Sequence, residues 1–208
     1  MNKKSILTAG TLALAISTAS SGVYSAELEE IIVTAQKRAE SLQDVPISMS
    51  ALSGSTVKDN GIHSFQDLSG YVPNLSIQEN AVNSIITMRG IGIGSNQSFE
   101  QSVGIYVDGV HFGKSRQVRT GLFDIEQLEV LRGPQGILFG KNTLAGAINV
   151  TTASADVGDE TSGRLDVTQE SFNGQIIDAH LQGSVTDNLA VRFALRDRTR
   201  DGHLKNTM

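Results

Sequence analysis

The sequence predicts an α+β domain, a small mixed sheet with short helices, followed by the start of an antiparallel β-sheet. Its 21 glycines and 5% aromatic residues favour a turn-rich fold over a helical bundle. Residues 41–153 mix short helical and strand patterns, whereas residues from 163 onward alternate apolar and polar side chains with a period of two. The two patterns predict two parts of different architecture.

Residues 1–26 are typical of a secretory signal peptide. Lys3 and Lys4 precede an apolar stretch at residues 6–16, and small residues follow it. This stretch is too short to cross a bilayer as a helix. Cleavage after Ala26 fits the pattern, but residues 23–25 offer a competing site, so the cleavage position stays open. The signal predicts an exported protein.

The composition excludes several classes of function. Removing residues 1–26 leaves 15 Lys and Arg against 22 Asp and Glu, a formal charge of −7, which argues against nucleic acid as a partner. No apolar stretch of 18 or more residues follows the signal, so a membrane role would have to come from β-strands. The absence of cysteine excludes disulfides, zinc–thiolate sites and thiol catalysis.

Residues 27–40 form a polar tail that contains a short strand-like run. A β-branched run so close to a mature N-terminus has little local core to pack against, so we interpret it as an edge strand offered to another protein. The run consists of Glu30, Ile31, Ile32, Val33, Thr34 and Ala35.

Within residues 41–153, two short helices are predicted first. Residues 53–60 have Ser or Thr caps and a stop at Gly61, and residues 64–68 are closed by Gly70. Asp108-Gly109 predicts a tight hairpin turn, because glycine accepts the positive φ that such turns require. The predicted strands are 84–88, 103–107, 110–112, 128–131 and 147–151.

Residues 154–162 are predicted to be a linker, and short strands follow it. The alternation is clearest at 177–185 and 189–195, which a short turn separates, and it is weaker at 163–169. Such segments fit the lipid-facing and lumen-facing sides of an outer-membrane barrel. An ordinary antiparallel sheet with one wet face has the same period, so the pattern alone leaves both open.

No residue pattern indicates an enzyme, a metal site or a cofactor. The glycine-rich stretches 89–94 and 136–142 lack the spacing of nucleotide-binding loops, and the four histidines are far apart. We interpret Asp124, Glu126 and Glu129 as solvated charges. Arg89 and Arg132 each follow a strand and precede a glycine turn, where a charge is costly unless it is paired; solvated arginines at loop starts are the alternative.

Eight motifs, in the same order, resemble the N-terminal part of TonB-dependent outer-membrane receptors of the siderophore type. They cover essentially all of the mature chain. The motifs are residues 31–38, 44–48, 72–75, 88–92, 105–110, 125–136, 138–143 and 146–150.

This resemblance assigns roles to the segments. It implies that 41–153 is a plug domain inside a 22-stranded barrel and that the segments from 163 are the first barrel strands. Residues 30–35 would be the TonB box, which adds as a strand to the periplasmic domain of TonB, itself driven by ExbB and ExbD. Arg89 and Arg132 would pair with barrel glutamates and lock the plug. The plug turns would be Gly90, Asp108, Gly109, Gly133, Pro134 and Gly140.

The resemblance also implies energy-coupled uptake of a scarce ligand, a ferric siderophore, by a monomer in the outer membrane. The plug and TonB box would face the periplasm, and loops near 93–101 and 111–119 would touch ligand. Because 22 strands need at least ~220 residues and only 46 follow residue 162, we expect a fragment, from a truncated gene or a partial sequence. The alternative is a soluble periplasmic plug-like module that binds TonB or a ligand without transport.

Overall fold

The computed structural model describes residues 31–34, 37–81, 83–93 and 100–202. The predicted signal peptide, Glu30 and Ala35 lie outside the described residues, as does most of the predicted ligand loop at 93–101. Among the described residues, no helix is long and apolar enough to cross a bilayer.

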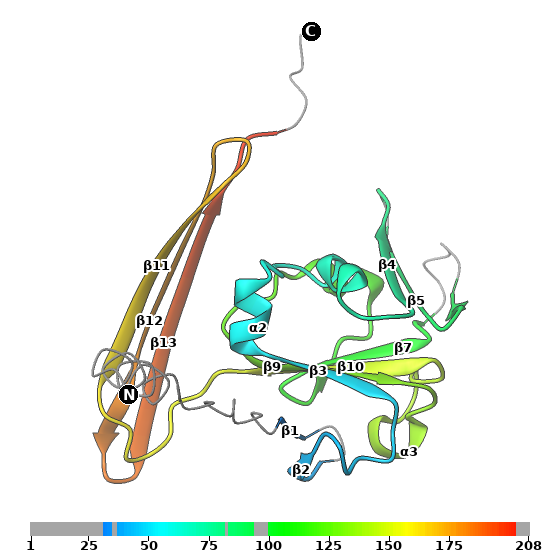
Figure 1. Cartoon of the computed structure of the whole chain (residues 1–208), viewed down its shortest axis with the longest axis horizontal. Helices are drawn as coiled ribbons and strands as arrows, with labels where there is room; N and C mark the ends of the chain where they lie inside the picture. Colours follow the sequence, from blue (N-terminus) through cyan, green and yellow to red (C-terminus); the bar gives the residue numbers. More distant parts are fainter. Residues whose placement is uncertain (1–30, 35–36, 82, 94–99, 203–208) are drawn as a thin grey trace, which may run out of the picture. The chain divides into compact units, whose positions relative to one another are not determined.

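A five-stranded mixed sheet organises the N-terminal domain, and the predicted α+β class is therefore confirmed (Figure 1). Strands β10 and β7 run parallel, while the other neighbours are antiparallel. In spatial order the strands are β3 (Met49–Ser53), β9 (Ile125–Arg132), β10 (Gly146–Thr152), β7 (Val103–Val107) and β8 (Val110–His111).

Two helical segments and a second sheet cover one face of this sheet. Helix α2 (Gly54–Asp59) begins where predicted, because the Ser53 side chain accepts a hydrogen bond from the Thr56 N–H and caps it. The second predicted helix is instead the 3-10 turn η1 (Gln66–Gly70). It starts two residues later than predicted. The turn before it is held by a reciprocal contact of the capping-box type: the Asp67 carboxylate accepts from the N–H groups of His63 and Ser64, and the Ser64 hydroxyl accepts from the Asp67 N–H.

The second sheet is antiparallel and consists of β4, β5 and β6. Only β5 (Ser84–Met88) was predicted from the sequence. The pattern missed β4 (Leu75–Glu79), the two-residue strand β6 (Ile91–Gly92) and the 3-10 turn η2 (Ser115–Arg119).

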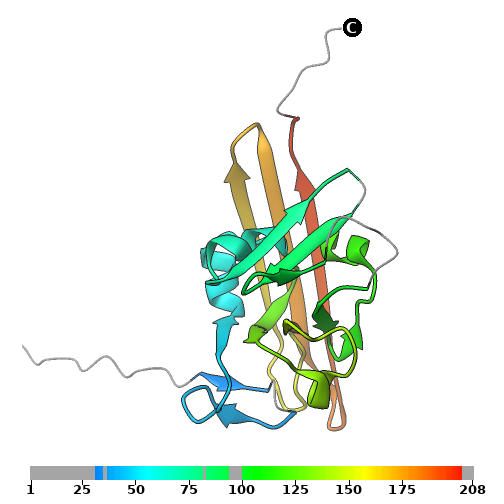
Figure 2. The ribbon, with the colours of Figure 1, turned by 90° about the vertical axis from the view of Figure 1, so that its right-hand side faces the viewer.

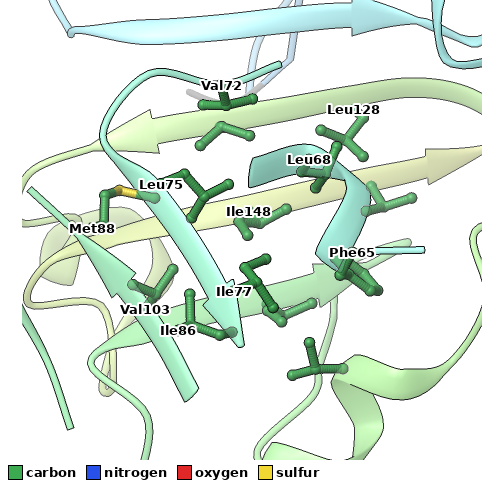
Figure 3. Close-up of a cluster of buried hydrophobic side chains, with 14 of the residues drawn as sticks. Phe65, Leu68, Val72, Leu75, Ile77, Ile86, Met88, Val103, Leu128 and Ile148 are labelled. Carbon is green, nitrogen blue, oxygen red and sulfur yellow. The ribbon is translucent and has the colours of Figure 1, made fainter. Parts of the chain in front are cut away.

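The main hydrophobic core lies between the five-stranded sheet and these elements (Figure 3). Leu128 and Ile148 project into it from the sheet, and Leu68 and Ile86 meet them from the covering layer; all four side chains are fully buried. Burying a side chain of this size contributes roughly 1.5–3 kcal/mol. This core fixes the sheet that positions the candidate site.

The opposite face of the same sheet carries smaller elements, β1 (Ile32–Val33), β2 (Glu40–Ser41) and α3 (Gly136–Phe139) (Figure 1). A second small cluster, which includes Leu131 and Ala147, is buried there. The five-stranded sheet is therefore covered on both faces, which explains why Leu131 and Ala147 on the second face are as fully buried as Leu128 and Ile148 on the first.

The predicted hairpin turn is confirmed between β7 and β8. Asp108 and Gly109 have φ of 48° and 78°, the two positive values that a type I′ turn requires. The Asp108 carboxylate also accepts hydrogen bonds from the N–H and hydroxyl of Thr152, which ties the hairpin to the end of β10. Gly90, Gly133 and Gly140 also have positive φ.

Three long antiparallel strands follow the domain, in the order β11, β12, β13 (Figure 2). Strands β11 (Ser162–Glu170), β12 (Gly174–Thr186) and β13 (Leu189–Thr199) match the three alternating segments of the sequence. The last residue of the predicted linker belongs to β11. The register places Leu165, Ala179 and Leu195 side by side, so the apolar residues of the three strands share one face.

Candidate functional site: the N-terminal strand and the charged contacts of the domain

The predicted edge strand finds a partner and a buried contact within the chain, so the expectation that it has little local core to pack against is wrong. Strand β1 pairs antiparallel with β2, and Val33, 1% exposed, lies opposite Glu40. The Leu42 N–H donates to the Ile31 carbonyl at 2.9 Å. Sequence reasoning missed this pairing because β2 is only two residues long and has no strand pattern.

Side chains of β9 cover the other edge of β1. In an antiparallel ladder, alternate residues direct their backbone groups to opposite edges, so Ile32 and Thr34 face away from β2. Glu129 Oε1 accepts a hydrogen bond from the Thr34 N–H at 2.6 Å, and Gln127 Nε2 donates to the Ile32 carbonyl at 2.7 Å. Both edges of β1 are therefore occupied.

Glu129 is the buried member of this arrangement. It is 1% exposed, which contradicts the expectation of a solvated charge. A buried carboxylate is costly unless its oxygens are hydrogen-bonded, and Glu129 Oε2 accepts from Asn149 Nδ2 at 2.9 Å on the neighbouring strand. The signal in the sequence was Leu131, an apolar residue two positions further along on the same face of the strand, which indicates that this face is also buried.

Arg89 and Arg132 come together although 43 positions separate them in the sequence. Arg89 Nη2 and Arg132 Nη1 donate to the same Ser48 hydroxyl at 2.8 and 3.1 Å, and Arg132 also donates to Ser50. Burial, and then the positive charge of Arg89, lower the pKa of Arg132. Among the described residues, neither guanidinium has a carboxylate within ion-pair distance, so the two charges form a site suited to anionic groups.

The polar face of the β11–β13 sheet binds the N-terminal domain through ion pairs. Arg192 of β13 makes a two-pronged contact with Asp124, at 2.8 and 2.5 Å, so Asp124 is not the solvated charge expected from the sequence. Lys58 of α2 pairs with Asp166 of β11. Glu126, by contrast, is exposed as predicted. These partners could not be paired from the sequence because about 70 to 110 residues separate them.

A cleft of about 260 Å³ lies between the two parts, lined by charged residues of both. Arg196 pairs with Asp178 on the neighbouring strand at 2.6 Å and also donates to the Leu122 carbonyl at 2.7 Å. His63 lies 3.7 Å from Glu170, and burial together with the charges of Arg196 and Arg198 lowers its pKa. Among the described residues, no group of three or more acidic or histidine side chains could hold a metal ion.

The other face of the β11–β13 sheet exposes large apolar side chains. Phe193 and Leu165 are each 68% exposed, and their neighbours on the same face are exposed to a similar degree. In a sheet of a water-soluble protein, the apolar face packs on the core and the polar face meets water. The β11–β13 sheet has the reverse arrangement, because its charged face binds the domain and its apolar face is exposed. This arrangement is that of strands whose outer face meets lipid.

The class of protein follows from these two parts: a mixed-sheet plug domain bound to the first strands of a membrane β-barrel wall. The family model "TonB-dependent Receptor Plug Domain" matches residues 41–147, more than half of the chain. The chain therefore belongs to the TonB-dependent receptor plug family.

The pesticin receptor of Yersinia pestis is 32% identical over 167 residues, which are 75% of this chain and 24% of that protein. The vitamin B12 transporter BtuB of Vibrio vulnificus is 27% identical over 62% of the chain and 21% of its own length. This chain thus spans about a quarter of the length of the curated relatives it matches. These relatives are receptors and transporters, not enzymes.

The crystal structure of the ferric yersiniabactin uptake receptor FyuA from Yersinia pestis is similar over 71% of this chain and 24% of that one, with a TM-score of 0.62 and 30% identity. The pyoverdine outer membrane receptor FpvA of Pseudomonas aeruginosa, at 16% identity, shares the fold with a TM-score of 0.69 over 83% of this chain and 25% of its own.

Proposed function

We propose that this chain acts in a TonB-dependent receptor of the outer membrane that takes up a scarce ligand with energy from TonB. The observation that carries the proposal is the reversed β11–β13 sheet, whose exposed apolar face needs lipid and whose charged face holds the domain. The predicted signal peptide supplies the export that this location requires, with the domain facing the periplasm. The receptor works as a monomer without a cofactor.

The segment at residues 30–35 is the TonB box of this proposal. It adds as an extra strand to the periplasmic domain of TonB, in which main-chain hydrogen bonds give the affinity. Support comes from its position: it lies at the edge of the domain, and Ile32 remains 46% exposed although Val33 is buried. The ExbB–ExbD complex supplies the proton-motive force, through TonB, that pulls on the plug.

Arg89 and Arg132 lock the plug against carboxylates of the barrel wall. The support is electrostatic: two neighbouring guanidinium groups repel each other, and only hydroxyls of Ser48 and Ser50 reach them among the described residues. Two glutamates would neutralise both charges through charge-assisted hydrogen bonds.

The ligand is a ferric siderophore. Support comes from the ferric yersiniabactin uptake receptor FyuA, which is 30% identical, against the vitamin B12 transporters as the competing class. Loops at 93–101 and 111–119 are its proposed contacts on the plug. The second of them contains η2, whose Arg119 is held by the carbonyls of Asn80 and Asn83.

The test is a proline substitution in the proposed TonB box. Ile32→Pro removes a backbone donor that strand addition uses, so we expect weaker binding of the TonB periplasmic domain and loss of uptake of an iron-loaded siderophore. Ile32→Ala keeps the backbone and serves as the matched control. Equal TonB affinity of both variants in a calorimetric titration would contradict the assignment of the box.

Fractionation tests the alternative of a soluble periplasmic module. The exposed apolar face of β11–β13 disfavours this module, because water would be in contact with that face. We expect the expressed protein in outer-membrane fractions. A folded monomer found in the periplasmic fraction would instead favour the module.

A further inference from the structure

We propose that Glu129 and Gln127 form a latch that holds residues Ile32–Thr34 on the domain and competes with the strand-adding partner. This inference rests on the proposed function, because the partner is the TonB periplasmic domain. Its physical basis is that a strand can accept a new neighbour only at a free edge, and here both edges of β1 are in use.

The pairing of β1 with β2 is too small to hold the segment by itself. Each strand has two residues, and an isolated two-stranded hairpin is marginally stable at best even when it is longer. The contacts that attach this small ribbon to the five-stranded sheet therefore decide whether it stays docked. Those contacts include the side chains of Glu129 and Gln127 from β9 and the burial of Val33.

The two latch residues are matched to the backbone that they hold. Residues 127 and 129 lie on the same face of β9, because side chains two positions apart in a strand share a face. The carboxylate of Glu129 reaches the N–H of Thr34, and the amide of Gln127 reaches the carbonyl of Ile32. The two side chains thus take the place of a neighbouring strand: Glu129 supplies the acceptor for a backbone N–H, and Gln127 supplies the donor for a backbone carbonyl.

The buried carboxylate makes the latch reversible. While β1 is docked, Glu129 has a backbone partner and the amide of Asn149. When the ribbon leaves, water reaches the Glu129 carboxylate and replaces the hydrogen bond from Thr34. The net free energy of release is therefore limited to exchanging one charged and one neutral hydrogen bond for bonds to water, and to losing the apolar contact of Val33. The segment can therefore be released by a partner without unfolding the main core on the other face of the sheet.

The first measurement reports release without TonB. The chain has no cysteine, so Val33→Cys introduces a single thiol at a buried site, and its rate of maleimide labelling measures how often β1 undocks. In the outer-membrane protein we expect Glu129→Ala to raise this rate about tenfold, and Gln127→Ala about fivefold, because a charged hydrogen bond is stronger than a neutral one. Glu126→Ala, an exposed glutamate on the same strand, is the matched control and should leave the rate unchanged.

The second measurement is affinity for the TonB periplasmic domain, in proteins that keep Val33. Removing the competing latch should tighten the apparent Kd by about the same factors, with no change for Glu126→Ala. Hydrogen exchange of β9 and β10 reports whether Glu129→Ala disturbs the sheet; if it does, the half-buried Gln127 variant decides the outcome.

Unchanged labelling in both latch variants would overturn the latch. Faster labelling without any binding of TonB, in variants or in the parent protein, would leave the latch standing and overturn the assignment of the box. Faster labelling with unchanged TonB affinity would show that the latch does not compete with the partner, which contradicts the proposal.

Discussion

In the plug domain, Leu68, Ile86 and Ile148 are fully buried, whereas in the β11–β13 sheet Leu165 and Phe193 expose most of their surface. The two regions draw on the same apolar residue types. What differs is the solvent that each apolar surface requires: the domain covers its own apolar side chains with a second layer, and the sheet exposes them on its outer face. The same types of apolar residue can therefore be buried in one region and exposed in another, when lipid replaces water as the neighbour of the second.

The largest expected effect is at the centre of the domain core. Leu68→Ala should lower the free energy of unfolding of the domain by about 3 kcal/mol, because it leaves a cavity in a closely packed core. Hydrogen exchange of β9 and β10 measures it. Leu165→Ala removes the same atoms from the exposed face and should leave that exchange unchanged; equal effects would erase the contrast between the two regions.

The next effect concerns the outer face of the sheet. Phe193→Lys places a charge among exposed apolar side chains, and in a bilayer such a charge costs about 2–4 kcal/mol near the midplane. We expect less protein in the outer membrane, with unchanged exchange in the domain core. Phe193→Leu is the control. Normal membrane insertion of the lysine variant would contradict the lipid-facing assignment.

A third prediction sharpens the boundary between the regions. Arg192→Ala breaks the two-pronged contact with Asp124 and leaves that carboxylate partly buried, so the segment around residues 122–125 should lose about 2 kcal/mol of protection against hydrogen exchange. Arg192→Lys keeps the charge but not the planar fork, and should recover only part of the loss. Protection unaffected by either change would mean that the ion pair does not join the two parts.

The smallest effect is the pH dependence of the same boundary. The folded protein holds the pKa of His63 below its ordinary value of 6.5, through burial and then the charges of Arg196 and Arg198. The unfolded chain therefore binds the proton more readily, so this histidine contributes stability above about pH 6.5 that is lost as the pH falls through the folded pKa. Unfolding measured between pH 7 and 5 should be less pH-dependent in His63→Gln; an identical dependence would contradict this role.

Local sequence signals predicted much of the backbone. The Ser53 cap, the Asp108-Gly109 turn and the three alternating strands are confirmed because each depends on neighbours within a few residues. The strands β2 and β6 were missed because two residues are too few to carry a period, whereas β4 was missed although Leu75 and Ile77 alternate with polar residues. The prediction that Glu129 is a solvated charge was wrong, because the residue type alone does not reveal which hydrogen-bond partner the fold brings next to it.

The sequence by itself determined the Ser53 helix cap, the Asp108-Gly109 turn, the three alternating strands and the family. Only the tertiary structure decided that Glu129 and Gln127 meet Ile32 and Thr34, that Arg89 joins Arg132 at Ser48, and that the charged rather than the apolar face of β11–β13 binds the domain. The physical reason is distance along the chain: helix caps and turns are made by neighbouring residues, whereas ion pairs and capped strand edges need the folded sheet to bring remote groups together.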